Sequence, residues 1–249
     1  MYIRNLFGIF TLTVFALVGC YSVMAGPGST STEVLTESPK DLDAFENLRI
    51  SGNFESAVVL SDRYRITVHG NERDIETVAV SVSNNTLYVE QETNRRIFGR
   101  TPRIEIEIET PEPLSNVRLS GSNHAHIASA GTLESLRLSG STRLRLDDLN
   151  SEKLSIRGSG SSGIEGNGTV ETLEVRQSGS SRLNFEETIT QEATLRTSGS
   201  SRVTLHVEEY LQVRSSGASK VYYIGNPEDI HTNTSGSATV KPAEQVSRR

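Results

Sequence analysis

The chain has 249 residues and a net charge of −6, with 35% hydrophobic residues, 6% aromatic residues and no tryptophan. The acidic balance gives no support for a nucleic-acid partner. With so few aromatic residues the chain cannot fill a wide globular core, but it can fill the narrow interior of a solenoid, where neighbouring coils supply the backbone hydrogen bonds.

The first twenty residues predict an export signal. Leu6 to Val18 is apolar but short for a membrane span, and Leu17-Val18-Gly19-Cys20 resembles a bacterial lipobox, in which the cysteine is lipidated and becomes the mature N-terminus. We therefore expect a signal peptide over residues 1–19 and a lipid anchor on Cys20, which would hold the protein in a membrane, at the outer membrane or cell surface. The alternative is cleavage after Ala25, which would release a soluble secreted or periplasmic protein.

Two less regular segments follow. Residues 20–43 are rich in Gly, Ser, Thr and Pro, and they predict a flexible tether behind the lipidated cysteine. Residues 44–113 predict an irregular N-terminal β region, because segments such as Arg103 to Glu109 alternate apolar and polar residues. Gly52 and Gly70 are 18 residues apart and indicate two irregular early coils.

Residues 114–242 contain seven copies of a tripeptide, Ser-Gly-Ser in six of them, and the tail over residues 243–249 is polar and predicted to fray. The central glycines recur at steps of 18 to 20 residues, as Gly121, Gly140, Gly160, Gly179, Gly199, Gly217 and Gly236. A fixed period near 20 residues is typical of a solenoid in which each repeat forms one coil. Glycine suits a tight corner because it tolerates a positive φ and the close approach of the next coil.

Apolar residues stand four positions before and four positions after these glycines, with polar neighbours on either side. Leu183 and Val203 are two members of the second set, and only Thr232 interrupts the first. Alternation of this kind is the period of a strand. The repeats therefore predict an all-β fold: a right-handed parallel β-helix, or β-solenoid, with about 19–20 residues per coil and a less regular N-terminal β-half.

The order of these features resembles a known family. Phe45-x-x-Leu-x-Ile50 is followed by Ser51-Gly52, by an alternating β-half and then by the Ser-Gly-Ser repeats. This pattern resembles the family called putative auto-transporter adhesin, head GIN domain, over about residues 44 to 240. The family is associated with β-helical folds in secreted or surface proteins, many of them lipoproteins. The resemblance implies adhesion or binding at the cell surface, and it brings no catalytic or binding residues to transfer.

A column of arginines is the most distinctive polar feature. It occupies the third position before the corner glycine, as Arg118, Arg137, Arg157, Arg176, Arg196 and Arg214, with Asn233 in the last coil. These side chains should point outward at a coil spacing of about 4.8 Å. One hypothesis is a basic stripe that binds an anionic polymer such as an acidic polysaccharide, or another surface protein. The alternative is a solvated face whose long side chains cover the sheet and discourage edge aggregation.

Other candidate sites have weaker support. His124 and His126 form an i, i+2 pair that could chelate a metal, although Arg143 and Arg145 in the next coil would oppose a cation. Acidic pairs such as Asp147-Asp148 could bind calcium, but they lack the spacing of calcium-binding β-roll repeats. We therefore expect no metal and no cofactor.

Catalytic motifs are also missing from the sequence, which has no Gly-x-Ser-x-Gly, no His-Glu-x-x-His and no phosphate loop. We expect a binding module of the envelope without catalytic activity. The alternatives are a structural envelope solenoid with no ligand and a polysaccharide-processing enzyme built on a β-helix, for which Arg176 near Glu174 is the nearest match to a catalytic pair.

Overall fold

The structure is a computed structural model that describes residues 36–92 and 104–243. It confirms the all-β fold, with a β-solenoid of about seven turns in residues 116–242 and a mixed sheet before it. The predicted signal peptide, Cys20 and the polar tail lie outside the described residues, except for Ala243. Among the described residues, no helix is long and apolar enough to span a membrane.

The N-terminal part contains six strands and one short helix. They are β1 (Thr36–Asp41), β2 (Asn47–Leu60), β3 (Arg65–Gly70), α1 (Glu72–Ile75), β4 (Val78–Ser83), β5 (Thr86–Gln91) and β6 (Glu105–Thr110). The repeats contain β7 (Asn116–Ile127), β8 (Ser135–Gly140), β9 (Arg143–Gly158), β10 (Gly163–Gln177), β11 (Arg182–Thr197), β12 (Arg202–Ser215), β13 (Lys220–Ile224), β14 (Asp229–Thr234) and β15 (Thr239–Pro242).

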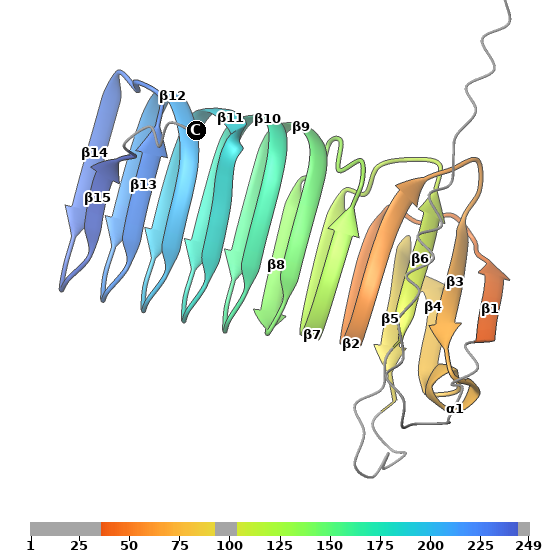
Figure 1. Ribbon diagram of the computed structural model, residues 1–249. Helices are drawn as coiled ribbons and strands as arrows, with labels where there is room; N and C mark the ends of the chain where they lie inside the picture. Colours follow the sequence, from red (N-terminus) through yellow and green to blue (C-terminus); the bar gives the residue numbers. More distant parts are fainter. Residues whose placement is uncertain (1–35, 93–103, 244–249) are drawn as a thin grey trace, which may run out of the picture. The chain divides into compact units, whose positions relative to one another are not determined.

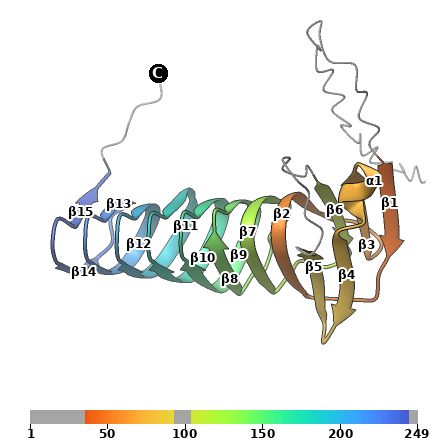
Figure 2. The same ribbon diagram turned by 90° about the horizontal axis from the view of Figure 1, so that it is seen from below.

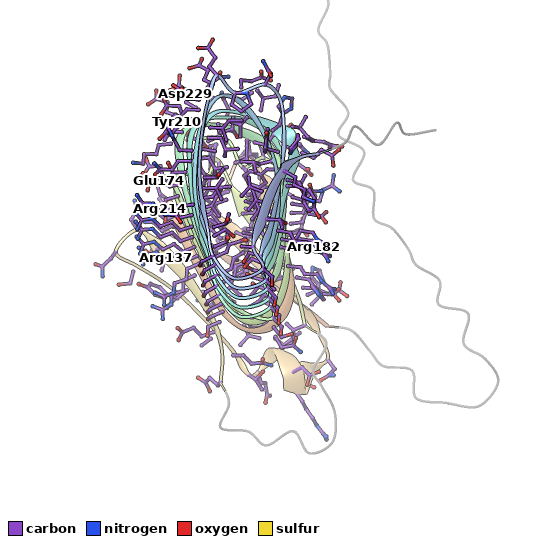
Figure 3. The ribbon with its side chains drawn as sticks, turned by 90° about the vertical axis from the view of Figure 1, so that its left-hand side faces the viewer. Arg137, Glu174, Arg182, Tyr210, Arg214 and Asp229 are labelled. Atoms are coloured by element: carbon purple, nitrogen blue, oxygen red, sulfur yellow. The ribbon has the colours of Figure 1, made fainter. Side chains whose placement is uncertain are left out.

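The repeats stack as parallel coils (Figure 1). Seen along the stack, each coil is a flattened loop with two long faces that meet at a tight corner (Figure 3). Leu183 of β11 pairs in register with Val203 of β12, and both side chains are fully buried, as the repeat alignment predicts. The last coil differs, because Thr232 replaces the apolar residue and all of β14 is exposed.

The corner glycines form a ladder of close backbone contacts. In Gly160 φ is +80°, and a methyl group there would lie 2.6 Å from the carbonyl oxygen of Gly140 on the preceding coil. The amide of Ser161 donates a hydrogen bond to that same carbonyl at 2.9 Å. The repeat therefore needs glycine at this position for two physical reasons, a left-handed backbone and the absence of a side chain.

Hydroxyl groups fill the inside of the corner. Ser181 and Ser201 stand in adjacent coils with their hydroxyl oxygens 3.1 Å apart, and those of Thr197 and Ser215 are 2.7 Å apart. All four residues are buried. Small hydrogen-bonded side chains let the two faces approach each other here, where larger apolar residues would force the coil open.

The first coil of the solenoid comes from the N-terminal part. β2 pairs in parallel with β7, with Gly52 opposite Gly121, so Gly52 is the first rung of the glycine ladder. The expectation for Gly70 is wrong: it ends β3, which pairs antiparallel with β1 and β6, and the chain then enters α1. Residues 61–115 therefore form an insertion between the first and second coils.

The insertion adds antiparallel structure at this end of the solenoid (Figure 2). β4 and β5 form a hairpin through Asn84 and Asn85, which both have the positive φ that such a tight turn requires. β1 lies inside the segment predicted to be a tether and pairs with β3, so residues 36–41 are part of the sheet. The boundary between tether and domain is therefore earlier in the chain than the composition indicates.

The buried core lies within a single continuous part of the chain. Every fully buried apolar side chain of the described residues lies between Phe45 and Val221, and the partly buried residues that pack on them extend from Leu42 to Val240. All described residues belong to one compact unit of the chain. A fragment of residues 34–249 therefore retains all of these core contacts.

Candidate functional site

The predicted arginines form a continuous ladder on one face of the solenoid. Consecutive members pair in register, for example Arg157 with Arg176 and Arg176 with Arg196. Figure 3 shows Arg137 and Arg214 on the same side of the coil. Each of the six is exposed, because its strand neighbours are the buried core residues and the alternation sends it to solvent. We call these six residues the arginine ladder.

A seventh arginine, which the repeat alignment missed, continues the row of the arginine ladder. Arg49 of β2 pairs in register with Arg118, so it continues the row into the first coil. Its guanidinium lies 5.9 Å from the ring centroid of Tyr88, which makes it half-buried and holds it by a cation–π contact. The sequence did contain a signal, since Arg49 stands three residues before Gly52, the same spacing as in the repeats.

The ladder carries positive charge with little local compensation. None of its six members forms an ion pair with a carboxylate among the described residues. Glu174, the acid beside them, instead pairs with Lys153 at 2.8 Å. The hydrogen bond from Lys153 is the main cause of the lowered pKa of Glu174, and the charges of Arg176 and Arg157 lower it further.

A groove of about 520 Å³ runs along the ladder. Its lining combines five of the arginines with one serine from each of four corners: Ser139, Ser159, Ser178 and Ser198. No aromatic side chain contributes. Guanidinium and hydroxyl groups are hydrogen-bond donors suited to carboxylate, sulfate or phosphate oxygens. The groove can therefore hold an extended anionic chain by charge and hydrogen bonds, without stacking.

The opposite face carries a different charge pattern. A groove of about 1050 Å³ lies there, lined by Arg143, Arg182, Arg202 and Lys220 toward the C-terminal coils and by Glu55, Glu105 and Glu107 toward the N-terminal sheet. It is the larger of the two, but its charges have both signs, and Gly163 interrupts its basic column. The smaller groove is therefore the better candidate for a uniformly anionic ligand.

The two candidate metal-binding histidines lie on this opposite face, and each has another partner. The Nε2 atom of His126 is 2.7 Å from a carboxylate oxygen of Asp147, and that of His124 is 3.2 Å from Arg143. Among the described residues, no group of three or more His, Cys, Asp or Glu side chains could hold a metal ion. The structure gives no support to the metal hypothesis.

The acidic pair Asp147-Asp148 has a structural role. Burial raises the pKa of Asp147, but hydrogen bonds from His126 and Asn167 and the charge of Arg145 outweigh it, so the pKa lies below the usual value. Asp148 has a φ of +56° and its amide donates to the side-chain oxygen of Asn167 at 3.0 Å. These contacts fix the bend opposite the glycine corner.

Comparison with known proteins places the chain in a family of putative adhesins. A family model described as putative auto-transporter adhesin, head GIN domain, matches residues 44–227. A putative adhesin from Bacteroides fragilis shares 17% identity over 85% of this chain and 98% of that chain, with a TM-score of 0.74. A putative adhesin from Parabacteroides distasonis shares 14% identity over 85% of this chain and 98% of that chain, with a TM-score of 0.64.

A putative lipid binding protein from Parabacteroides distasonis is similar as well, with 16% identity over 84% of this chain and 97% of that chain and a TM-score of 0.63. At these identities the likeness shows the fold alone. No curated protein matches the chain. The family that the repeats and the Phe45 to Gly52 segment resemble is confirmed.

Proposed function

The chain belongs to the putative auto-transporter adhesin, head GIN domain family, and from this premise we propose that it is a non-catalytic binding module of the cell envelope whose arginine ladder holds an acidic polysaccharide. The lipobox-like segment ending in Cys20 supports attachment to a membrane by a lipid anchor, at the outer membrane or cell surface. The observation that carries the proposal is the row of six exposed, in-register arginines without an ion pair among the described residues.

The electrostatics favour an external anion. Neighbouring rungs are about 4.8 Å apart, and two like charges at that distance in water repel by roughly 1 kcal/mol. Repulsion of this kind accumulates along the row, and side-chain splay relieves only part of it. A polyanion that follows the row relieves the rest, and its many weak contacts act together.

The groove also indicates which ligands to expect. Because no aromatic side chain lines it, a neutral sugar has no ring to stack on. Recognition must come from carboxylate or sulfate groups on the polymer, so binding should be weak for each repeat and sensitive to salt. A neutral polysaccharide should not bind.

The test uses residues 34–249 and polygalacturonate as the acidic probe, with neutral dextran as the comparison polymer. Isothermal titration at about 20 mM salt should show binding to polygalacturonate alone, and salt near 1 M, where the Debye length is about 3 Å, should abolish it. Changing Arg137, Arg157, Arg176 and Arg196 together to Gln should also abolish binding and leave the circular dichroism spectrum unchanged.

A matched control removes four positive charges elsewhere. Lys40, Arg63, Arg73 and Lys241 are exposed and lie outside the ladder. Changing these four to Gln alters the net charge by the same amount and should preserve binding. Loss of binding in both variants would show a general charge effect, and absence of binding in the unmodified protein at low salt would favour a structural solenoid without this ligand.

A further inference from the structure

The face opposite the arginine ladder changes sign along the stack. Between β3 at one edge and β15 at the other, the strands of this face follow one another in the order β6, β2, β7, β9, β10, β11, β12 and β13. Exposed acids stand at one end, at Glu107 of β6 and Glu55 of β2, and cations at the other, at Arg202 of β12 and Lys220 of β13. Figure 3 shows Arg182, which belongs to the basic end, on the side away from Arg137. We call this surface the bipolar face.

The middle of the bipolar face combines both signs with a gap. Arg143 of β9 stands in register with Gly163 of β10, and Arg145 stands in register with Glu165. Arg143, Arg145 and Glu165 are exposed. Gly163 has no side chain, and a methyl group there would contact only Arg143, at 3.8 Å. The column of cations therefore lacks a side chain at Gly163, in the centre of the face and next to the carboxylate of Glu165.

A surface with this arrangement is complementary to itself. A two-fold axis that lies in the plane of the face, parallel to its strands and between β9 and β10, places a second copy face to face with the first. It reverses the strand order, and each outward position keeps its distance from the corner. Such isologous contacts are the commonest way in which identical chains pair. The rotation brings Glu55 of one copy over Arg202 of the other, and the acidic end, which includes Glu107, over the basic end, which includes Lys220.

The same rotation matches the centre of the face. Arg145 of one copy meets Glu165 of the other, and Arg143 meets the gap above Gly163. The charges are thus complementary at both ends and at the centre, whereas a uniform polyanion would be repelled by the acidic end.

From this complementarity we propose that two copies of this chain pair through their bipolar faces, a property distinct from polysaccharide binding by the ladder. Eight strands at about 4.8 Å span roughly 35 Å, and a length of about four residues per strand, of which alternate ones point outward, gives a width of roughly 13 Å. The contact is then about 450 Å² per copy, below the about 800 Å² of a standard interface. The dimer is therefore weak, reversible and sensitive to salt.

The test is sedimentation velocity on residues 34–249 over a wide range of protein concentration. At low salt the sedimentation coefficient should rise with concentration toward that of a dimer, and at 1 M salt the protein should remain a monomer. One variant carries Glu55→Lys and Glu107→Lys, and a second carries Arg202→Glu and Lys220→Glu. Each alone places like charges at both ends of the pair and should be a monomer.

Mixing the two variants decides the question. In the mixed pair the lysines of the first variant face the glutamates of the second, and the unaltered ends keep their opposite charges. Dimers should therefore reappear at an equimolar ratio. Their return also shows that both variants are folded. A control with Glu152→Lys and Glu192→Lys, two exposed acids outside the bipolar face, makes the same charge change as the first variant and should still form dimers.

Three outcomes would overturn the proposal: a monomer at every concentration at low salt, a mixture that stays monomeric, or a control that loses the dimer. A fourth outcome uses polygalacturonate. If it binds the four-arginine ladder variant but not the Arg202→Glu, Lys220→Glu variant, the bipolar face binds a polyanion and the dimer proposal is wrong. The ladder variant keeps the bipolar face, so loss of polysaccharide binding with retention of the dimer separates the two functions.

Discussion

A methyl group on Gly179 would lie 2.6 Å from the carbonyl oxygen of Gly160 on the preceding coil. Gly179 also has a φ of +83°, which is unfavourable for a residue with a Cβ atom. The carbonyl cannot move away, because the amide of Ser180 donates to it at 2.9 Å. We predict that Gly179→Ala lowers the free energy of unfolding by roughly 2–4 kcal/mol.

Urea unfolding followed by circular dichroism measures this change. Ser178→Ala, at the exposed neighbouring position, is the control and should shift the midpoint little. Equal midpoints for Gly179→Ala and the unmodified protein would mean that the corner is loose enough to accept a side chain.

The second prediction concerns the narrow core. Leu183 is fully buried and pairs in register with Ile164 on one side and Val203 on the other, so Leu183→Asp would place a carboxylate among apolar side chains. Burying a charge without a partner costs several kcal/mol. We expect loss of cooperative thermal unfolding, while Ser180→Asp at the exposed corner should retain it. A melting temperature that Leu183→Asp leaves unchanged would contradict the inward orientation of this column.

The repeat alignment was sufficient to predict the regular coils, because each position in a coil has a constant environment. Stacking in register places Arg157 beside Arg176 and Leu183 beside Val203 whatever the details of the turns. A period in the sequence thus converts directly into neighbours in space, which is why both the core columns and the arginine ladder could be identified without coordinates.

The sequence indicates an early coil at Gly52, but the pairing of this coil with the regular repeats could not be recognised in the same way. Gly52 pairs with Gly121, but the insertion between them breaks the period and hides the relation. The contacts of Asp147 with His126 and Asn167 could not be predicted from the sequence either, because they depend on side-chain positions at the irregular bend. The opposite signs at the two ends of the bipolar face follow from this same nonlocal pairing, which joins β2 and β6 to the stack.

The third prediction is a pH effect on stability. The pKa of Asp147 is lowered by its hydrogen bonds with His126 and Asn167 and by Arg145, against the opposing effect of burial. A carboxyl group with a lowered folded-state pKa stabilises the fold above its unfolded pKa near 3.9, and that stabilisation is lost as the pH falls through the folded value. Asp147→Asn should therefore cost about 1 kcal/mol at pH 7 and less near pH 2.

Urea midpoints of the Asp147→Asn variant and of the unmodified protein, measured at pH 7 and near pH 2, give the cost of the substitution at each pH. The other acids titrate in both proteins, so their effect cancels in this comparison. Glu186→Gln is a suitable control because Glu186 is exposed and forms no ion pair with a described residue. A cost for Asp147→Asn that is the same at pH 7 and pH 2 would show that its charge does not contribute.

The fourth prediction concerns the anchor. Because Cys20 ends a lipobox-like sequence and is the only cysteine in the chain, the full-length protein should incorporate labelled fatty acid at this residue and fractionate with membranes. Cys20→Ser should abolish the label and move the protein to soluble fractions. A mature protein that begins at Gly26 and is soluble without any change would show instead that the signal peptide is cleaved after Ala25.

The last prediction concerns position within the arginine ladder. Arg176 has an arginine in register on each side, Arg157 and Arg196, whereas Arg214 has Asn233 on one side. Each neighbour adds to the local field, so a central rung lies in a stronger positive potential than a terminal one. Arg176→Gln should therefore weaken polygalacturonate binding at low salt more than Arg214→Gln does, although both remove one charge. Equal losses in isothermal titration would mean that the rungs act independently and that net charge alone governs binding.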